Sequence, residues 1–213
     1  MRRDPFITGE YYHIYNRGVE KRKIFLCNKD YFRFLESMKE FNNAKPVYSL
    51  FLHRELKRRG ALDVQRLKEL VEIVCYCLNP NHFHFILKQT VENGISEYMK
   101  RIGGGYTKYF NHHNQRSGFL FQGRFKSVHI KTNAQLLYLS AYVNKNRYIH
   151  GYGDDLDWPF SSFQEYTGKR NNGICNRNEI RNQFKSKSEY REFIQENALY
   201  MKEKKEDEKY LLE

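Results

Sequence analysis

Two histidines, His82 and His84, are separated by a single residue in an apolar run that ends at Leu87. Side chains alternate between the two faces of an extended strand, so both imidazoles would project from one face while Phe83 and Phe85 point into a core. Two neighbouring imidazoles on one face could bind a single metal ion. The spacing is equally compatible with two histidines that only decorate a solvated strand face.

A tyrosine and an asparagine four residues apart, Tyr142 and Asn146, fall in a stretch whose pattern predicts a helix. Side chains at this spacing share a helix face. A tyrosine can attack phosphorus once its phenol loses a proton, and an asparagine oxygen is a ligand for hard divalent cations such as Mg²⁺ or Mn²⁺. The chain has 17 tyrosines. Spacing alone therefore favours the alternative that Tyr142 packs against the sheet with its hydroxyl satisfied.

The elements that would position these groups alternate between strands and helices. A turn at residues 79–81 separates two apolar runs, which predicts two strands around it. Periodicity predicts further strands over 10–15 and 119–129, and helices over 30–41, 95–111, 133–148 and 189–213. Three glycines at 103–105 fall inside a predicted helix, where we expect a kink or the close approach of another backbone.

The chain length favours one domain, or one domain with an appendage. We expect a domain over residues 1–168, with an inserted loop or short helices over about 46–68. The remaining residues, 169–213, would form a polar linker and a charged C-terminal helix whose end is a solvated charge run.

Positive charge is concentrated in the middle of the chain. The formal net charge is +12, and residues 98–153 contain no Asp or Glu but nine Lys or Arg and eleven Phe or Tyr. Cations interleaved with aromatic rings suit a surface that neutralises phosphates and stacks unpaired bases, so we expect a nucleic-acid partner. The candidate phosphate contacts are Lys108, Arg116, Arg124 and Lys126, followed by Arg17, Arg101 and Lys131.

Composition argues against several other classes of protein. The longest apolar run is too short for a membrane span, and no apolar signal stretch follows Met1, so we expect a cytoplasmic, nucleoid-associated protein with no membrane partner. Four scattered cysteines do not suggest a disulfide framework. We interpret Cys75 and Cys77 as small core residues rather than zinc ligands.

Four stretches, taken in order, resemble the single-tyrosine HUH transposases, the group that includes REP-associated tyrosine transposases and related insertion-sequence enzymes. They are residues 12–18, 77–87, 106–111 with 118–127, and 136–146 with 158–163. Together they span most of residues 10–166.

The resemblance implies roles for individual residues. His82, His84 and Asn146 would be ligands of Mg²⁺ or Mn²⁺, and Tyr142 would be the nucleophile. The implied activity is cleavage and rejoining of single-stranded DNA, folded as a hairpin, by metal-assisted transesterification through a 5′-phosphotyrosine. The implied fold is α+β: a ferredoxin-like (palm-like) antiparallel sheet with helices mainly on one face and the metal–tyrosine site on the other.

Two other functions fit parts of this pattern. A domesticated, noncatalytic nucleic-acid-binding regulator would keep the basic aromatic surface and would have no use for a nucleophile. A replication or relaxation initiator uses similar chemistry and usually carries further domains. Some members of the family that this chain resembles act as monomers. Others pair two chains, so that one chain gives its tyrosine to the metal of the other. The resemblance is therefore compatible with either a monomer or a homodimer.

Overall fold

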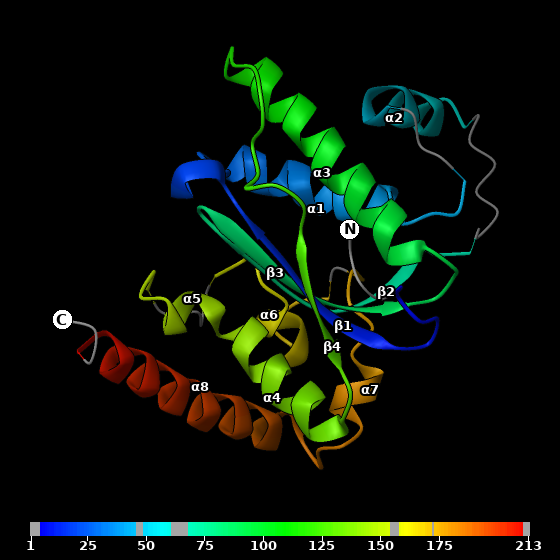
Figure 1. Cartoon of the computed structure of the whole chain (residues 1–213). Coiled ribbons are helices and arrows are strands. Elements are labelled where there is room, and N and C mark those ends of the chain that lie inside the picture. Colours follow the sequence, from blue (N-terminus) through cyan, green and yellow to red (C-terminus); the bar gives the residue numbers. More distant parts are fainter. Residues whose placement is uncertain (1–4, 46–48, 61–67, 154–157, 172, 211–213) are drawn as a thin grey trace.

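A four-stranded antiparallel sheet forms the centre of the computed structural model, which describes residues 5–45, 49–60, 68–153, 158–171 and 173–210 (Figure 1). The strands are β1 (Tyr11–Arg17), β2 (Val71–Asn79), β3 (His82–Gln89) and β4 (Lys126–Ile130), and their order in the sheet is β2-β3-β1-β4. The strand that carries the histidine pair, β3, is therefore an interior strand, flanked by β2 and β1.

β2 and β3 form a hairpin around Pro80 and Asn81, which confirms the predicted turn. In this hairpin Asn79 pairs with His82, and Cys77 pairs with His84. Directly paired residues project to the same face of an antiparallel sheet. Both histidines therefore share a face with the side chains that end β2, while the phenylalanines between and after them are buried on the opposite face.

Two helices cover that opposite face. α1 (Asn28–Glu40) connects β1 to β2, and α3 (Gly94–His113) connects β3 to β4. Each joins two parallel strands that are not neighbours, and right-handed crossovers place both helices on the same side. The resulting βαββαβ order is the ferredoxin-like topology, so the α+β class is confirmed. The predicted insertion contains α2 (Leu50–Arg58), while residues 46–48 and 61–67 lie outside the described residues.

Helices also cover the face that carries the histidines, whereas the sequence predicted helices mainly on one face (Figure 1). They are α4 (Asn133–Asn144), α5 (Asn146–Ile149), α6 (Phe163–Tyr166), α7 (Asn178–Arg181) and α8 (Lys187–Tyr210). The physical reason is that this face is apolar beside the imidazoles. Val74, Cys75, Cys77 and Ile86 are fully buried there and need a covering layer.

The charged C-terminal helix is confirmed as a helix, and it is packed on the protein. α8 lies along α4, and its buried residues Tyr190, Ile194, Ala198 and Met201 recur at helical spacing in the second core. The division of the chain near residue 168 stays a prediction. No helix among the described residues combines the length and apolar character that a membrane span requires.

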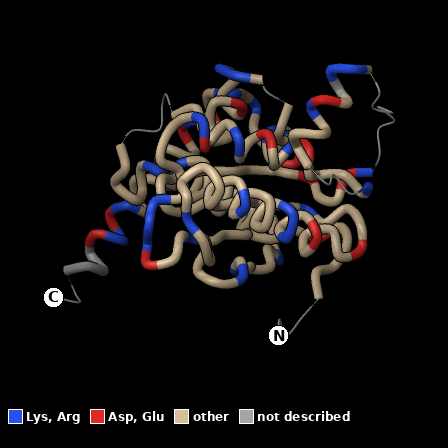
Figure 2. The backbone as a smooth tube through the Cα atoms, turned by 90° about the horizontal axis from the view of Figure 1, so that it is seen from above, with Lys and Arg blue, Asp and Glu red and all other residues tan. Residues whose placement is uncertain are grey.

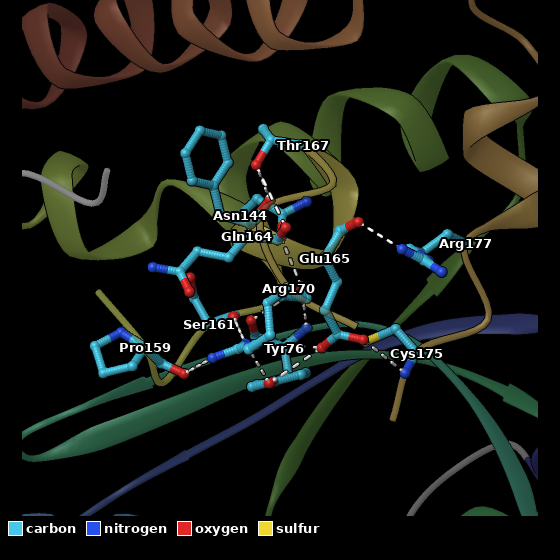
Figure 3. Close-up of polar contacts among 12 residues, drawn as sticks. Tyr76, Asn144, Pro159, Ser161, Gln164, Glu165, Thr167, Arg170, Cys175 and Arg177 are labelled. Carbon is cyan, nitrogen blue, oxygen red and sulfur yellow. Dashed lines mark hydrogen bonds and ion pairs between the residues drawn. The ribbon is translucent and has the colours of Figure 1, made fainter. Parts of the chain in front are cut away.

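The segment predicted as a polar linker before the C-terminal helix contains α7, and its first residues are anchored to β2 by a buried carboxylate (Figure 3). Glu165 accepts a hydrogen bond from the Tyr76 hydroxyl at 3.2 Å and lies 3.8 Å from the Arg170 guanidinium. Arg177 donates to the Glu165 carbonyl oxygen at 2.6 Å. Burial raises the pKa of the Glu165 carboxyl. These contacts hold the chain after α6 against β2.

Two predicted elements are shorter than expected. The strand over 119–129 begins only at Lys126, and Phe121 makes an isolated bridge with Gly18 instead. The helix over 133–148 ends at Asn144 and restarts as α5 at Asn146. Lys145 between them has φ −108° and ψ 14°, outside the α-helical region.

The three glycines at 103–105 lie within one uninterrupted helix, α3, so the predicted kink is absent. A Cβ atom at Gly105 would lie 2.7 Å from the Phe41 ring, whereas one at Gly104 would meet nothing within 4 Å. The close approach at this glycine is therefore made by an aromatic side chain at the end of α1, not by another backbone.

The two neighbouring glycines should respond to alanine in opposite ways. Gly104→Ala is expected to raise the free energy of unfolding by about 1 kcal/mol, because alanine is the better helix former and the position is open. Gly105→Ala must displace the buried Phe41 ring, and should be less stable than Gly104→Ala by about 1–3 kcal/mol. Urea unfolding of the two variants measures this difference, and equal midpoints would contradict the close contact.

Candidate active site

The two histidines of β3 lie side by side and are almost completely buried, with ring centroids 5.2 Å apart. His82 Nδ1 lies 2.6 Å from the side-chain oxygen of Asn81 in the hairpin turn. An amide oxygen can only accept, so Nδ1 carries the ring proton in this arrangement and Nε2 is left with a lone pair. The turn thus fixes His82 in the tautomer that can bind a cation through Nε2.

Asn146 brings a second electron-pair donor to the same point. Its side chain is completely buried, and its Oδ1 lies 3.1 Å from His82 Nε2. Asn79 donates through Nδ2 to this oxygen at 2.7 Å, and the same nitrogen lies 3.0 Å from His82 Nε2. Among the described residues, Asn146 Nδ2 is buried with no hydrogen-bond partner. Two converging lone pairs are a favourable arrangement for a divalent cation.

His84 is held by a histidine from the neighbouring strand. His13 of β1 shares a hydrogen bond with it, with 2.9 Å between His13 Nε2 and His84 Nδ1. When His84 donates this bond, its Nε2 is free to bind a cation, which is the usual outer-shell arrangement for metal-binding imidazoles. His13 was not predicted as a site residue, and the only signal for it in the sequence was its place in a predicted strand.

Burial keeps these imidazoles neutral. It lowers the pKa of His13 and His82 to about 4, and lowers the pKa of His84 well below its ordinary value. Neutral imidazole is the form that binds metal. Counting only His, Cys, Asp and Glu, the described part of the chain holds no cluster of three that could bind a metal ion. A metal would therefore need the Asn146 oxygen as its third protein ligand, and the donor set fits that requirement.

The metal-free protein should lose stability as the pH falls from 6.5 to 5. The unfolded chain binds protons on these three histidines below about 6.5, whereas the folded chain keeps His13 and His82 neutral down to about 4. The free energy of unfolding should therefore fall by about 2 kcal/mol for each imidazole in this window and be level above it. Urea unfolding in the presence of a chelator measures the slope.

His13→Phe removes one of the three imidazoles and provides the control for this pH dependence. Its slope between pH 6.5 and 5 should be about one third smaller than that of the wild type. A free energy of unfolding that stays level across the window in the wild type would contradict the buried, neutral histidines.

Tyr142 reaches the imidazoles from α4. Its half-buried ring stands edge-on to His84, with centroids 5.4 Å apart, and to His13 at 5.9 Å. Its hydroxyl lies 3.2 Å from His150 Nε2. Burial raises the pKa of the Tyr142 phenol, while the nearby Asn146 side chain opposes the rise. The tyrosine and both histidines thus meet within one chain.

The break at Lys145 separates the two residues that the sequence placed on one continuous helix. Tyr142 belongs to α4 and Asn146 begins α5. The buried Lys145 turns its ammonium over the Phe163 ring, 4.5 Å from the centroid. Both side chains still face β3, Tyr142 beside His84 and Asn146 beside His82.

Two of the predicted DNA contacts lie on the face opposite the imidazoles. Lys108 and Arg101 are both on α3. Arg101 pairs with Glu97 at 2.8 Å and donates to the carbonyl oxygen of Asn43 at 2.6 Å, so its guanidinium holds α3 to the end of α1. The stretch without Asp or Glu, residues 98–153, is divided between α3 and α4, which lie on opposite sides of the sheet. In Figure 2 basic positions are accordingly spread over the molecule.

Other predicted contacts lie near the site. Arg17 pairs with His82 across the sheet, and Lys126 pairs with Tyr15, whose ring stacks on His84 at 5.5 Å. Their register places both cations on the imidazole face, and both are exposed. The remaining predicted contacts are in the segments before and after β4: Arg116, Arg124 and Lys131.

Comparisons with known proteins agree with this architecture. The family model described as "Transposase IS200 like" matches residues 59–146, a range that includes His82, His84, Tyr142 and Asn146. Over these residues the chain is similar to the IS200-like transposases, as the sequence resemblance predicted. No curated protein matches the chain.

Two of the solved structures that are similar to the chain are transposases. One is a REP-associated tyrosine transposase bound to a REP hairpin, with a TM-score of 0.53, 20% identity, and coverage of 79% of this chain and 86% of that chain. The other is a putative transposase from Deinococcus radiodurans R1, with a TM-score of 0.38, 10% identity, and coverage of 71% and 96%. The first similarity establishes a shared fold.

Proposed function

We propose that this chain, a relative of the IS200-like transposases, is a transposase that cleaves and rejoins single-stranded DNA with Tyr142 as its nucleophile. One observation carries the proposal: the Tyr142 phenol stands against His84, beside the point where His82 Nε2 and Asn146 Oδ1 converge. A nucleophile and a cation-binding group on one apolar sheet face are the parts that phosphoryl transfer requires.

His82, His84 and Asn146 would hold Mg²⁺ or Mn²⁺, which when bound would polarise the scissile phosphate. The remaining tasks belong to the chain itself. Asn79 holds the Asn146 oxygen in place, and His13 orients the His84 ring. Both helper groups are buried, so they keep these orientations without competition from water.

The proposed reaction exchanges one phosphodiester for another. The Tyr142 oxygen forms a bond to phosphorus and the phenol proton passes to solvent. The bond from phosphorus to the 3′-oxygen breaks, and that oxygen takes up a proton as a 3′-hydroxyl. The 5′ end stays attached to the tyrosine. Because no bond energy is lost, the 3′-hydroxyl of another strand can reverse the step, and no nucleotide triphosphate is consumed.

The exposed cations on the imidazole face would guide the DNA backbone to the tyrosine. Arg17 and Lys126 are the best placed, since the register of β1 and β4 puts them beside the imidazoles. A hairpin is the proposed substrate because the structural relative that shares the fold was solved with a REP hairpin. A homodimer is not needed to bring the tyrosine to the histidines.

A single-stranded hairpin labelled at its 3′ end, downstream of the cleavage site, tests the proposal. In the presence of Mn²⁺ the protein should form a labelled adduct that survives denaturing electrophoresis, and chelation of the metal should prevent it. If the protein binds single-stranded DNA tightly and forms no adduct on any such substrate, the function is that of a noncatalytic regulator.

A further inference from the structure

We propose that the C-terminal helix α8 completes the catalytic site: Lys205 orients His150, and His150 in turn positions the phenol oxygen of Tyr142. This inference rests on the proposed function, because it concerns the nucleophile assigned there. It makes Lys205 and His150 positioning residues, acting through hydrogen bonds on the group that would attack the DNA.

Two contacts in series connect the helix to the nucleophile. Lys205 Nζ lies 2.6 Å from His150 Nδ1, and the opposite ring nitrogen, His150 Nε2, lies 3.2 Å from the Tyr142 hydroxyl oxygen. His150 follows α5 directly, and its ring also stands against His82 with centroids 5.3 Å apart. The imidazole therefore lies between the ammonium group and the phenol.

The first contact sets the direction of the second. An ammonium group can only donate, so His150 Nδ1 accepts from Lys205. In a neutral imidazole the proton then resides on Nε2, which donates to the Tyr142 oxygen. One lone pair of that oxygen is fixed by this bond, and the direction of the other follows from it. A phenol held this way can present its remaining lone pair to a phosphate without first reorienting.

The position of Lys205 is determined by packing. Met201, one turn earlier on α8, is buried in the second core, and residues four apart share a helix face. Lys202 makes a second contact to the same region, with its ammonium 4.6 Å from the centre of the Tyr148 ring on α5. Figure 1 shows the C-terminal part of α8 running past α5. Lys205 thus projects from an anchored helix.

The test measures cleavage and binding separately on a labelled hairpin with Mn²⁺. Lys205→Met keeps the length of the side chain and removes its ammonium. At saturating DNA, the single-turnover rate of adduct formation should fall about tenfold, since a charge-assisted hydrogen bond is lost. Lys204→Met, an exposed neighbour that loses the same charge, is the matched control and should cleave at the wild-type rate. Lys205→Arg should recover part of the rate.

A double substitution tests whether the two residues act in series. His150→Phe keeps a ring and removes both nitrogens, and should slow cleavage at least as much as Lys205→Met. His150→Phe combined with Lys205→Met should be no slower than His150→Phe alone. The proposal is overturned if Lys205→Met cleaves at the same rate as Lys204→Met. It is also overturned if the fold-losses in rate of His150→Phe and Lys205→Met multiply in the double variant.

Nitrogen chemical shifts of His150 distinguish this inference from the proposed function. The wild type should show the Nε2–H tautomer, and Lys205→Met should shift the balance towards Nδ1–H. If wild-type protein forms no adduct, the proposed function is wrong, and the tautomer measurement still decides whether the hydrogen-bond chain exists. An unchanged tautomer in Lys205→Met contradicts the chain whatever the cleavage result.

Discussion

Tyr142→Phe should abolish the covalent adduct with single-stranded DNA while the protein still binds the hairpin. The substitution removes one oxygen atom, and that atom is the proposed nucleophile. We expect the rate of adduct formation to fall by about a thousandfold or more, with the dissociation constant for DNA changed by about twofold at most. Single-turnover assays and a binding titration on the same hairpin separate the two quantities.

Tyr138→Phe is the matched control for this prediction. Tyr138 lies one turn earlier on α4 and its side chain is exposed, so the same chemical change there should leave the adduct intact. The hydroxyl of Tyr142 also bonds to His150, so its loss should cost about 1 kcal/mol of stability, which thermal unfolding would reveal. An adduct formed by Tyr142→Phe at the wild-type rate would assign the nucleophile to another residue.

His82→Ala and His84→Ala should each weaken Mn²⁺ binding by about a hundredfold or more. Each removes one imidazole of the adjacent buried pair that would hold the metal together with the Asn146 oxygen. In typical metal sites, loss of an outer-shell partner already lowers the metal affinity about 10–100-fold, and loss of a direct ligand lowers it further. Calorimetric titration with Mn²⁺ measures the affinity, and the adduct assay should show a parallel loss of cleavage.

His129→Ala is the control for the metal prediction. His129 lies on β4, 3.1 Å from the Glu10 carboxylate, and its ring stacks on Tyr12 on the side of the sheet away from the imidazoles. Its removal should leave Mn²⁺ affinity unchanged. If His82→Ala and His84→Ala bind Mn²⁺ as tightly as this control does, the two histidines are not metal ligands.

Local patterns were sufficient to predict much of the fold. Period-two alternation placed both histidines on one face of a strand, and Pro80 with Asn81 marked the hairpin. Helical spacing predicted α1, α3 and α8 to within a few residues. These features depend on residues close together in the chain, where steric preferences and hydrophobic periodicity are decisive.

The parts that were not predicted depend on long-range pairing. His13 reaches His84 only because β1 inserts between β3 and β4, and Lys205 reaches His150 only because α8 packs along α4. Neither contact has a local signal. The break of the helix at Lys145 was also missed, because it depends on the surroundings of a buried lysine and not on a proline or glycine.

The interior position of β3 has a mechanical consequence for the proposed reaction. The imidazoles are fixed to a strand that is paired on both sides, whereas Tyr142 is fixed to a helix. A DNA strand joined to the tyrosine would be tethered to α4, and tension along that strand would be borne first by the contacts of α4 with α8 and with the sheet. The two imidazoles would bear this load only through the contacts between α4 and the sheet.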